Sequence, residues 1–162
     1  MVKKIVFFLT LSLIVLASWQ CSKSDNSACT AASASSEEPA ILSYIAAQSI
    51  TATKDPSGMY YQIIEPGSGG SPTINSKVAV KYAGYLLNGN KFDEMTTPEP
   101  DPNKWWSLGG LIEGWKIGIP MIKKGGKIKM IIPSSLAYGC SAIGSIPANS
   151  ILIFDVELVD FN

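Results

Sequence analysis

From residue 57 to the end of the chain, segments of alternating apolar and polar residues are separated by turns rich in glycine. Alternation with a period of two is typical of strands that bury one face, and Gly and Pro mark the turns between them. The segments lie at residues 59–65, 77–85, from 91 onward, 127–132 and 151–159. One interval, between Gly110 and Gly126, instead favours a short helix. Five strands and one short helix predict an α+β domain with a mostly antiparallel sheet.

The alternation also assigns side chains to the faces of the predicted sheet, because successive side chains of a strand point to opposite sides. The residues expected to share a face within their strand are Val78, Val80 and Tyr82; Ile128, Met130 and Ile132; and Leu152, Phe154 and Val156. We expect the second set to point inward.

The helical interval is apolar and has a tryptophan near its start, in the sequence Leu111-Ile112-Glu113-Gly114-Trp115. Rings and aliphatic side chains that can line a pocket occur on both sides of it along the chain. They are Tyr82, Phe92, Trp105, Trp106, Tyr138, Ile146 and Phe154. All thirteen cationic residues are lysine, and histidine is absent. A ring-lined pocket without imidazole or guanidinium indicates chemistry that depends on shape and on the exclusion of water.

Composition argues against several other classes of function. The formal net charge is zero and 16% of the residues are charged, so we expect no nucleic-acid-binding surface. The absence of histidine removes the commonest metal ligand and general base. The three cysteines have no CxxC spacing, which argues against zinc and iron–sulfur sites. We therefore expect no metal and no cofactor.

The first twenty residues have the pattern of an export signal. Lys3 and Lys4 precede an apolar stretch over residues 5–16, which is too short to span a membrane. Cys21 follows soon after this stretch, as in lipoprotein signals, where the cysteine is acylated and becomes the first residue of the mature chain. Trp19 and Gln20 depart from that pattern, so ordinary secretion with an unmodified Cys21 is the alternative.

An exported protein reaches an oxidising compartment, where cysteines can form disulfides. If Cys21 is acylated, Cys29 and Cys140 remain as a pair. The sequence leaves open whether they form one disulfide or remain two free thiols.

Residues 21–38 are rich in Ser and Ala and lack apolar periodicity, which predicts a flexible linker. Apolar residues at helical spacing begin at Ile41, and Glu37-Glu38-Pro39 suits a first turn, so we expect a short helix near 39–50, either packed on the domain or extending the linker. A turn follows at residues 55–58. The predicted order is a signal peptide at 1–20, a linker at 21–38, a helix and turn at 39–56, and the folded domain at 57–162.

Several short motifs follow one another in the predicted domain. They are Val80-Lys81-Tyr82-Ala83-Gly84; Gly89-Asn90-Lys91-Phe92-Asp93; Leu111-Ile112-Glu113-Gly114-Trp115; Gly125-Gly126-Lys127; Ile132-Pro133; Ala137-Tyr138-Gly139; Ile146-Pro147-Ala148-Asn149; and the strand from 151 to 158. In this order they resemble the FK506-binding-protein (FKBP) family of peptidyl-prolyl cis-trans isomerases over residues 57–162. Each motif alone arises by chance, whereas the ordered set is specific.

The resemblance implies a curved, five-stranded antiparallel half-barrel wrapped around one short helix, with the ligand pocket between them. Trp115 would form the floor under the proline ring of the substrate. The Tyr138 hydroxyl and the Ile112 backbone N–H would donate to substrate carbonyls. The implied catalytic residues are Tyr82, Phe92, Asp93, Trp115, Tyr138 and Phe154, and the implied substrate-binding residues are Leu111, Ile112, Trp106 and Ile146. Whether Trp105 or Trp106 faces the pocket is open, because the preceding loop is longer than usual.

The implied activity is peptidyl-prolyl cis-trans isomerisation in exported proteins, with no cofactor. The implied partners are proline-containing polypeptides, FK506-type macrolides and, through Cys21, a membrane of the bacterial cell envelope. Two alternatives remain at this point. The chain is a proline-peptide-binding or chaperone module without relevant turnover, or it is a scaffold that acts through other surfaces.

Overall fold

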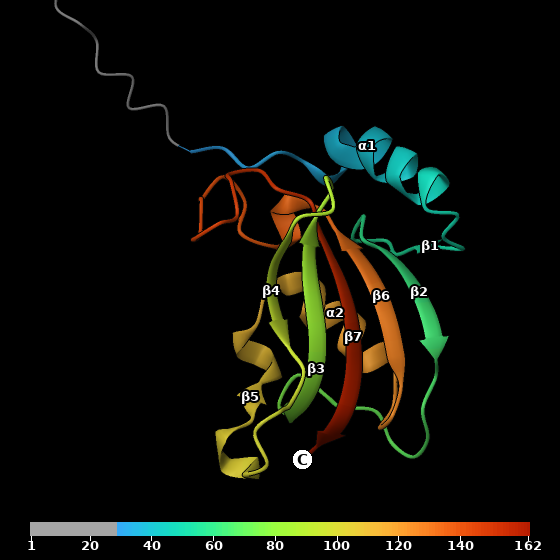
Figure 1. Ribbon diagram of the computed structural model, residues 1–162, viewed down its shortest axis with the longest axis vertical. Coiled ribbons are helices and arrows are strands. Elements are labelled where there is room, and N and C mark those ends of the chain that lie inside the picture. The colour runs from blue at the N-terminus through green and yellow to red at the C-terminus, as the bar shows by residue number, and fades with distance from the viewer. Residues whose placement is uncertain (1–28) are drawn as a thin grey trace, which may run out of the picture.

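The structure, a computed structural model, describes residues 29–162, and the strands in this range form one antiparallel sheet (Figure 1). The strand order is β1-β2-β6-β7-β3-β4, and β5 pairs separately with β3. The strands are β1 (Thr53–Lys54), β2 (Tyr60–Glu65), β3 (Lys77–Leu86), β4 (Lys91–Met95), β5 (Trp106–Ser107), β6 (Lys127–Ile132) and β7 (Leu152–Phe161). The two longest strands, β3 and β7, pair at the centre of the sheet.

The predicted fold class is confirmed, and the five expected strands correspond to β2, β3, β4, β6 and β7. The sheet has seven strands because β1 and β5, of two residues each, also join it. Two residues are too few to show an alternating pattern. Since β1 starts at Thr53, the sheet also begins before residue 57, where we expected the domain to start.

The inner face of the sheet packs on the short helix α2 (Glu113–Gly118), which lies behind the strands in Figure 1. The predicted inward set of β6 is buried, and the β3 and β7 sets join the same core cluster, which confirms the assigned faces. Residues 29–162 also contain four 3-10 helices. They are η1 (Pro102–Lys104), η2 (Leu108–Gly110), η3 (Ile119–Met121) and η4 (Ser134–Leu136).

A second helix, α1 (Ala34–Ala47), covers part of the outer face. Ile41 is fully buried there, in a second apolar cluster with Ile131 and Ile153, which alternate with the inward residues of β6 and β7. Glu38 of α1 accepts hydrogen bonds from the Lys54 ammonium and the Tyr60 hydroxyl, both at 2.6 Å. This helix therefore packs against the sheet directly.

The structure corrects the boundaries predicted for this part of the chain. The helix begins at Ala34, after the N-cap Ser33, and it ends at Ala47 rather than near residue 50. Residues 34–38 are therefore helical and are no part of a flexible linker, and Pro39 lies inside the helix. The Ser- and Ala-rich start has no apolar stripe to reveal it, but a serine N-cap stabilises it without one.

The pair left open by the sequence is a disulfide: Cys29 and Cys140 are bonded, with their Cα atoms 5.5 Å apart. The signal peptide at 1–20, Cys21 and the first part of the predicted linker lie outside the described residues. No helix within residues 29–162 has the length and apolar character needed to cross a membrane.

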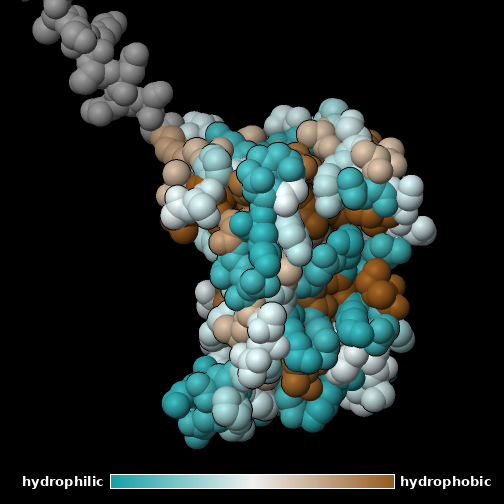
Figure 2. Space-filling view, in the orientation of Figure 1, coloured by the Kyte–Doolittle hydropathy of each residue, from teal (hydrophilic) through white to brown (hydrophobic). Residues whose placement is uncertain are grey.

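The rest of the outer face is polar, as Figure 2 shows, with hydrophobic surface exposed beside β2. The polar character comes from ion pairs between neighbouring strands, Lys129 with Asp155, Lys127 with Glu65, and Lys81 with Glu157. Such exposed pairs contribute at most about 1 kcal/mol each. This part of the outer face is therefore solvent-exposed, and the main apolar core lies on the inner face of the sheet.

Candidate active site

A cavity of about 580 Å³ opens between the inner face of the sheet, α2 and the neighbouring loops. Its lining residues are Tyr82, Phe92, Asp93, Trp105, Trp106, Ser107, Gly110, Leu111, Ile112, Trp115, Tyr138 and Phe154. Every residue predicted for the pocket is in this set except Ile146. The structure therefore brings together residues that the sequence spreads over more than seventy positions.

Trp115 lies at the base of an aromatic cluster and is only 4% exposed. Its ring meets those of Tyr82 and Phe154 edge-on, with ring centres 5.3 and 5.2 Å apart. Such edge-to-face pairs are a favoured aromatic geometry. The indole N–H is buried and has no hydrogen-bond partner among the described residues. Trp115 thus contributes to the cavity by packing against the neighbouring rings and not by hydrogen bonding.

Tyr82 and Asp93 form a polar contact at the cavity between β3 and β4. The Tyr82 hydroxyl donates to Asp93 Oδ2 at 2.5 Å. Burial and this hydrogen bond raise the pKa of Tyr82 far above its usual value, so the hydroxyl stays protonated. Because the Tyr82 hydroxyl donates its hydrogen bond to Asp93, Tyr82 contributes its ring, and not a hydrogen-bond donor, to the cavity.

Phe92 and Phe154 form the next part of the wall, edge-to-face with ring centres 5.5 Å apart. Gly84 of β3 makes this pair possible, because a Cβ there would lie 2.6 Å from the Phe92 ring and 2.9 Å from the Phe154 ring. We did not predict a role for Gly84. The signal was a glycine within a strand, which often marks such a close approach.

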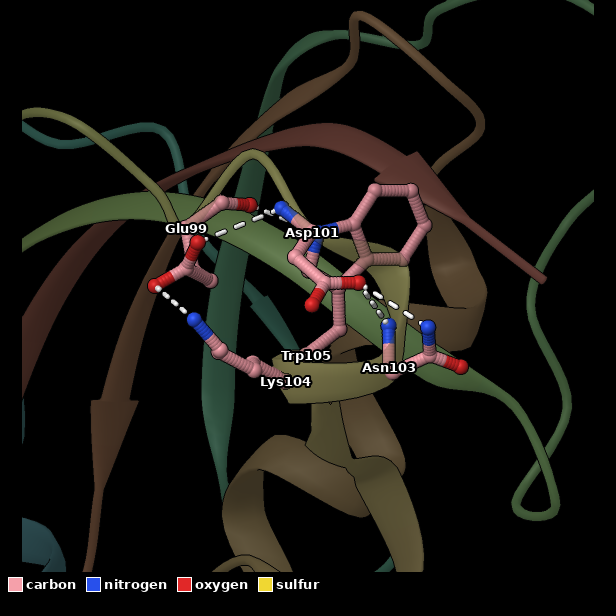
Figure 3. A network of polar contacts seen from close by, with 5 residues as sticks. All are labelled: Glu99, Asp101, Asn103, Lys104 and Trp105. Carbon is pink, nitrogen blue, oxygen red and sulfur yellow. Dashed lines mark hydrogen bonds and ion pairs between the residues drawn. The ribbon is translucent and has the colours of Figure 1, made fainter.

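Both adjacent tryptophans line the cavity, which answers the question left open by the sequence. Trp106 of β5 contacts the central cluster, with its ring centre 5.8 Å from that of Tyr82. The Trp105 indole N–H donates to the Glu99 backbone carbonyl at 2.7 Å (Figure 3). The Trp105 N–H is thereby satisfied, so this residue offers mainly carbon surface to a ligand.

The loop that holds Trp105 is ordered by its own polar contacts (Figure 3). Asp101 caps η1 by accepting from the Asn103 backbone N–H at 3.0 Å, and the Asp101 N–H donates to the Glu99 carboxylate at 3.2 Å. The Lys104 ammonium lies 3.9 Å from the same carboxylate. The long loop before Trp106 is therefore held in place by its own contacts and adds Trp105 to the cavity lining.

Tyr138 and Ile112 provide hydrogen-bond donors at the cavity. Tyr138 follows η4 and is 38% exposed, and Ile112 is the N-cap residue of α2. None of the hydrogen bonds within residues 29–162 uses the Tyr138 hydroxyl or the Ile112 backbone N–H. Both groups can therefore donate to a ligand carbonyl.

Ile146 does not line the cavity, although the resemblance implied that it binds substrate. It is 6% exposed and belongs to the core cluster. Its backbone exchanges two hydrogen bonds with Ile143, of 2.9 and 2.8 Å, in a tight turn. This turn directs Ile146 into the core and leaves Ile143 exposed.

No group of three or more Cys, Asp or Glu side chains in the described part of the chain is arranged to hold a metal ion. The cavity combines an aromatic floor and walls with a small number of donors. Such a site can exclude water from an apolar ring and hold the carbonyls beside it.

Comparison with known proteins agrees with this geometry. The sequence profile of the family described as FKBP-type peptidyl-prolyl cis-trans isomerase matches residues 69–159. The chain is 47% identical over 103 residues to the isomerase FkpA of Escherichia coli K12, and 48% identical over 108 residues to FK506-binding protein 4 of Dictyostelium discoideum. Each match covers 64% of this chain, but only 37% and 28% of the respective relative.

Solved structures show the same similarity in three dimensions. The crystal structure of FkpA from Escherichia coli matches with a TM-score of 0.69 and 36% identity, over 80% of this chain and 61% of that one. A peptidyl-prolyl cis-trans isomerase from Pseudomonas syringae matches with a TM-score of 0.66 and 29% identity, over 82% and 98%. With the profile covering more than half of its residues, the chain belongs to the family of FKBP-type peptidyl-prolyl cis-trans isomerases.

Proposed function

We propose that this chain catalyses cis-trans isomerisation of the peptide bond that precedes proline in exported polypeptides. The cavity carries the proposal: its aromatic floor and walls suit a pyrrolidine ring, and Tyr138 and Ile112 supply donors that no described residue uses. A volume near 580 Å³ is in the range of ligand-binding sites. Membership of the isomerase family supports the same activity.

The mechanism follows from the difference between a planar and a twisted amide. Rotation about the bond has a barrier of about 20 kcal/mol and takes tens of seconds or longer without a catalyst. The planar amide is polar and well hydrated, whereas the twisted amide has lost resonance and carries less charge on oxygen. Transfer into a dry cavity therefore disfavours the planar form more. Catalysis is then preferential binding of the twisted form, without a covalent step.

The energy required is modest. A thousandfold acceleration corresponds to about 4 kcal/mol. A neutral hydrogen bond from Tyr138 would contribute about 0.5–1.5 kcal/mol of this, and desolvation and packing on Trp115 and Phe92 would have to supply the rest. We propose that FK506-type macrolides bind the same cavity, since they would contact the same aromatic side chains.

Replacing Tyr138 with phenylalanine tests the proposal directly. The ring is retained and the donor is lost, so kcat/KM in a protease-coupled proline-peptide assay should fall about three- to tenfold. Tyr85→Phe is the matched control, because Tyr85 packs in the cluster under α1 and does not line the cavity. An unmodified chain without measurable isomerisation that still binds proline peptides would instead support a binding module.

We further propose that the chain is exported and anchored to a membrane through acylated Cys21. The export pattern before Cys21 supports this, and the disulfide between Cys29 and Cys140 is typical of an oxidising compartment. A fatty-acid analogue supplied to bacteria expressing the full chain should label the protein, and Cys21→Ser should abolish the label. Label that persists in Cys21→Ser, or its absence from the unmodified chain, would contradict the anchor.

A further inference from the structure

The segment before and at the start of α1 lies along the loop that carries Tyr138. We call residues 29–37 the N-terminal strap; the loop comprises residues 133–151, between β6 and β7. In Figure 1 the blue strap runs beside the orange loop. The disulfide from Cys29 to Cys140 joins them covalently, two residues after Tyr138. The strap therefore reaches the part of the loop nearest to the cavity.

Two polar contacts join the same segments. Glu37, only 8% exposed, accepts a hydrogen bond from the buried backbone N–H of Ser134 at 2.7 Å. The Ala32 backbone N–H donates to Asn149 Oδ1 at 3.1 Å. Small residues allow the close approach, since a Cβ added at Gly139 would lie 3.2 Å from the Cβ of the strap's Ala31.

Hydrogen bonds inside the loop connect these contacts to Tyr138. The Ser134 carbonyl accepts from the N–H groups of Ala137 and Gly139, the two neighbours of Tyr138, at 3.0 and 2.8 Å. The Gly139 carbonyl in turn accepts from the Asn149 N–H at 2.8 Å. Each end of this short chain of bonds is thus held by the strap.

We propose that the N-terminal strap positions the Tyr138 hydroxyl in the cavity, with Glu37 as a positioning residue and the disulfide as its covalent anchor. The inference rests on the proposed function, in which Tyr138 donates to the substrate. A loop residue that is already ordered loses less conformational entropy when the substrate binds. The strap lies outside residues 69–159, so it is an addition to the part of the chain that the family profile matches.

A double-mutant cycle on the full chain tests this role. Glu37→Ala should reduce kcat/KM about three- to tenfold, mainly through KM, because it leaves the buried Ser134 N–H without its acceptor. Glu37→Gln should remain near the unmodified value, since its amide oxygen can accept the same bond. In a Tyr138→Phe background the alanine variant should lose no more than about twofold further, because the group being positioned is already absent.

Glu38→Ala is the control on the same helix. Glu38 binds Lys54 and Tyr60 rather than the loop, so kcat/KM should be unchanged. Equal losses from Glu37→Ala in both backgrounds, or no loss in either, would overturn the positioning role. An inactive unmodified chain, or full activity in Tyr138→Phe, would count against the proposed function instead.

Amide hydrogen exchange provides a readout that is independent of turnover. Exchange at Gly139 and Asn149 should be about tenfold faster in Glu37→Ala, and also in the variant with both Cys29 and Cys140 replaced by serine. The second variant gives a result even if the first does not fold. Exchange rates at these two amides that match those of the unmodified chain would refute the strap as the element that orders the loop.

Discussion

Replacing Trp115 with alanine is expected to lower the free energy of unfolding by about 3–5 kcal/mol and kcat/KM about tenfold or more. The side chain is 4% exposed and supports the rings of Tyr82 and Phe154 from below. Its removal leaves a void in the core and takes away the surface on which the proline ring would rest. The affinity for an FK506-type macrolide should fall with the activity, since both depend on the same floor.

Trp115→Phe separates the loss of stability from the loss of kcat/KM. Phenylalanine keeps a ring in place and removes an indole N–H that has no partner among the described residues, so the loss of stability should be much smaller than with alanine. Denaturant unfolding gives the stabilities, and the proline-peptide assay is run where each variant is folded. Full activity and macrolide affinity in folded Trp115→Ala would show that Trp115 is only a core residue.

The strands could be predicted because their pattern is local. In β6, Ile128, Met130 and Ile132 alternate with polar residues over most of the strand, and one buried face is enough to produce that pattern. Ile131 breaks the alternation because α1 buries part of the second face. The two-residue strands β1 and β5 exist only through pairing with β2 and β3, and no local pattern can reveal that.

Most of the cavity could be anticipated because ordered motifs imply positions in a family fold. The structure places Tyr82, Phe92 and Trp115, from three different elements, around one cavity. Trp105 could not be assigned, because its place depends on how the longer loop folds around Glu99. Ile146 was assigned by motif alone, and the tight turn with Ile143 directs it into the core.

The contacts of the N-terminal strap could be predicted only in part, since the Cys29–Cys140 disulfide was one of two alternatives and the Glu37–Ser134 contact was not anticipated. Glu37 and Ser134 are separated by 97 positions, and Cys29 and Cys140 by 111. The buried environment of Glu37 exists only once α1 has packed on the sheet. A Ser- and Ala-rich segment without periodicity gives no sign of such packing, so the sequence favoured a flexible linker.

Replacing Gly114 with valine should destabilise the protein by about 3 kcal/mol, through overpacking rather than a void. A Cβ at Gly114 would lie 2.5 Å from Ile132 Cγ2 and 2.6 Å from Ile132 Cδ1. Ile132 is fully buried in β6 and is branched at Cβ, so it has no free space into which to move. Because Gly114 precedes Trp115 in α2, moving the helix away from the sheet would also displace the cavity floor. Chemical denaturation and the proline-peptide assay measure the two effects.

A compensating substitution distinguishes this clash from a general effect of valine in a helix. Ile132→Ala removes the three atoms nearest to the new Cβ, so the two substitutions together should cost less than the sum of the single ones. Gly70→Val controls for the replacement of a glycine by valine without a clash, because Gly70 lies outside the helices and strands, is exposed, and a Cβ there would lie 3.8 Å from its nearest neighbour, Phe161. Strictly additive losses of unfolding free energy in the double variant would show that α2 can move away from β6. Glycine at position 114 would then not be what fixes the position of the cavity floor.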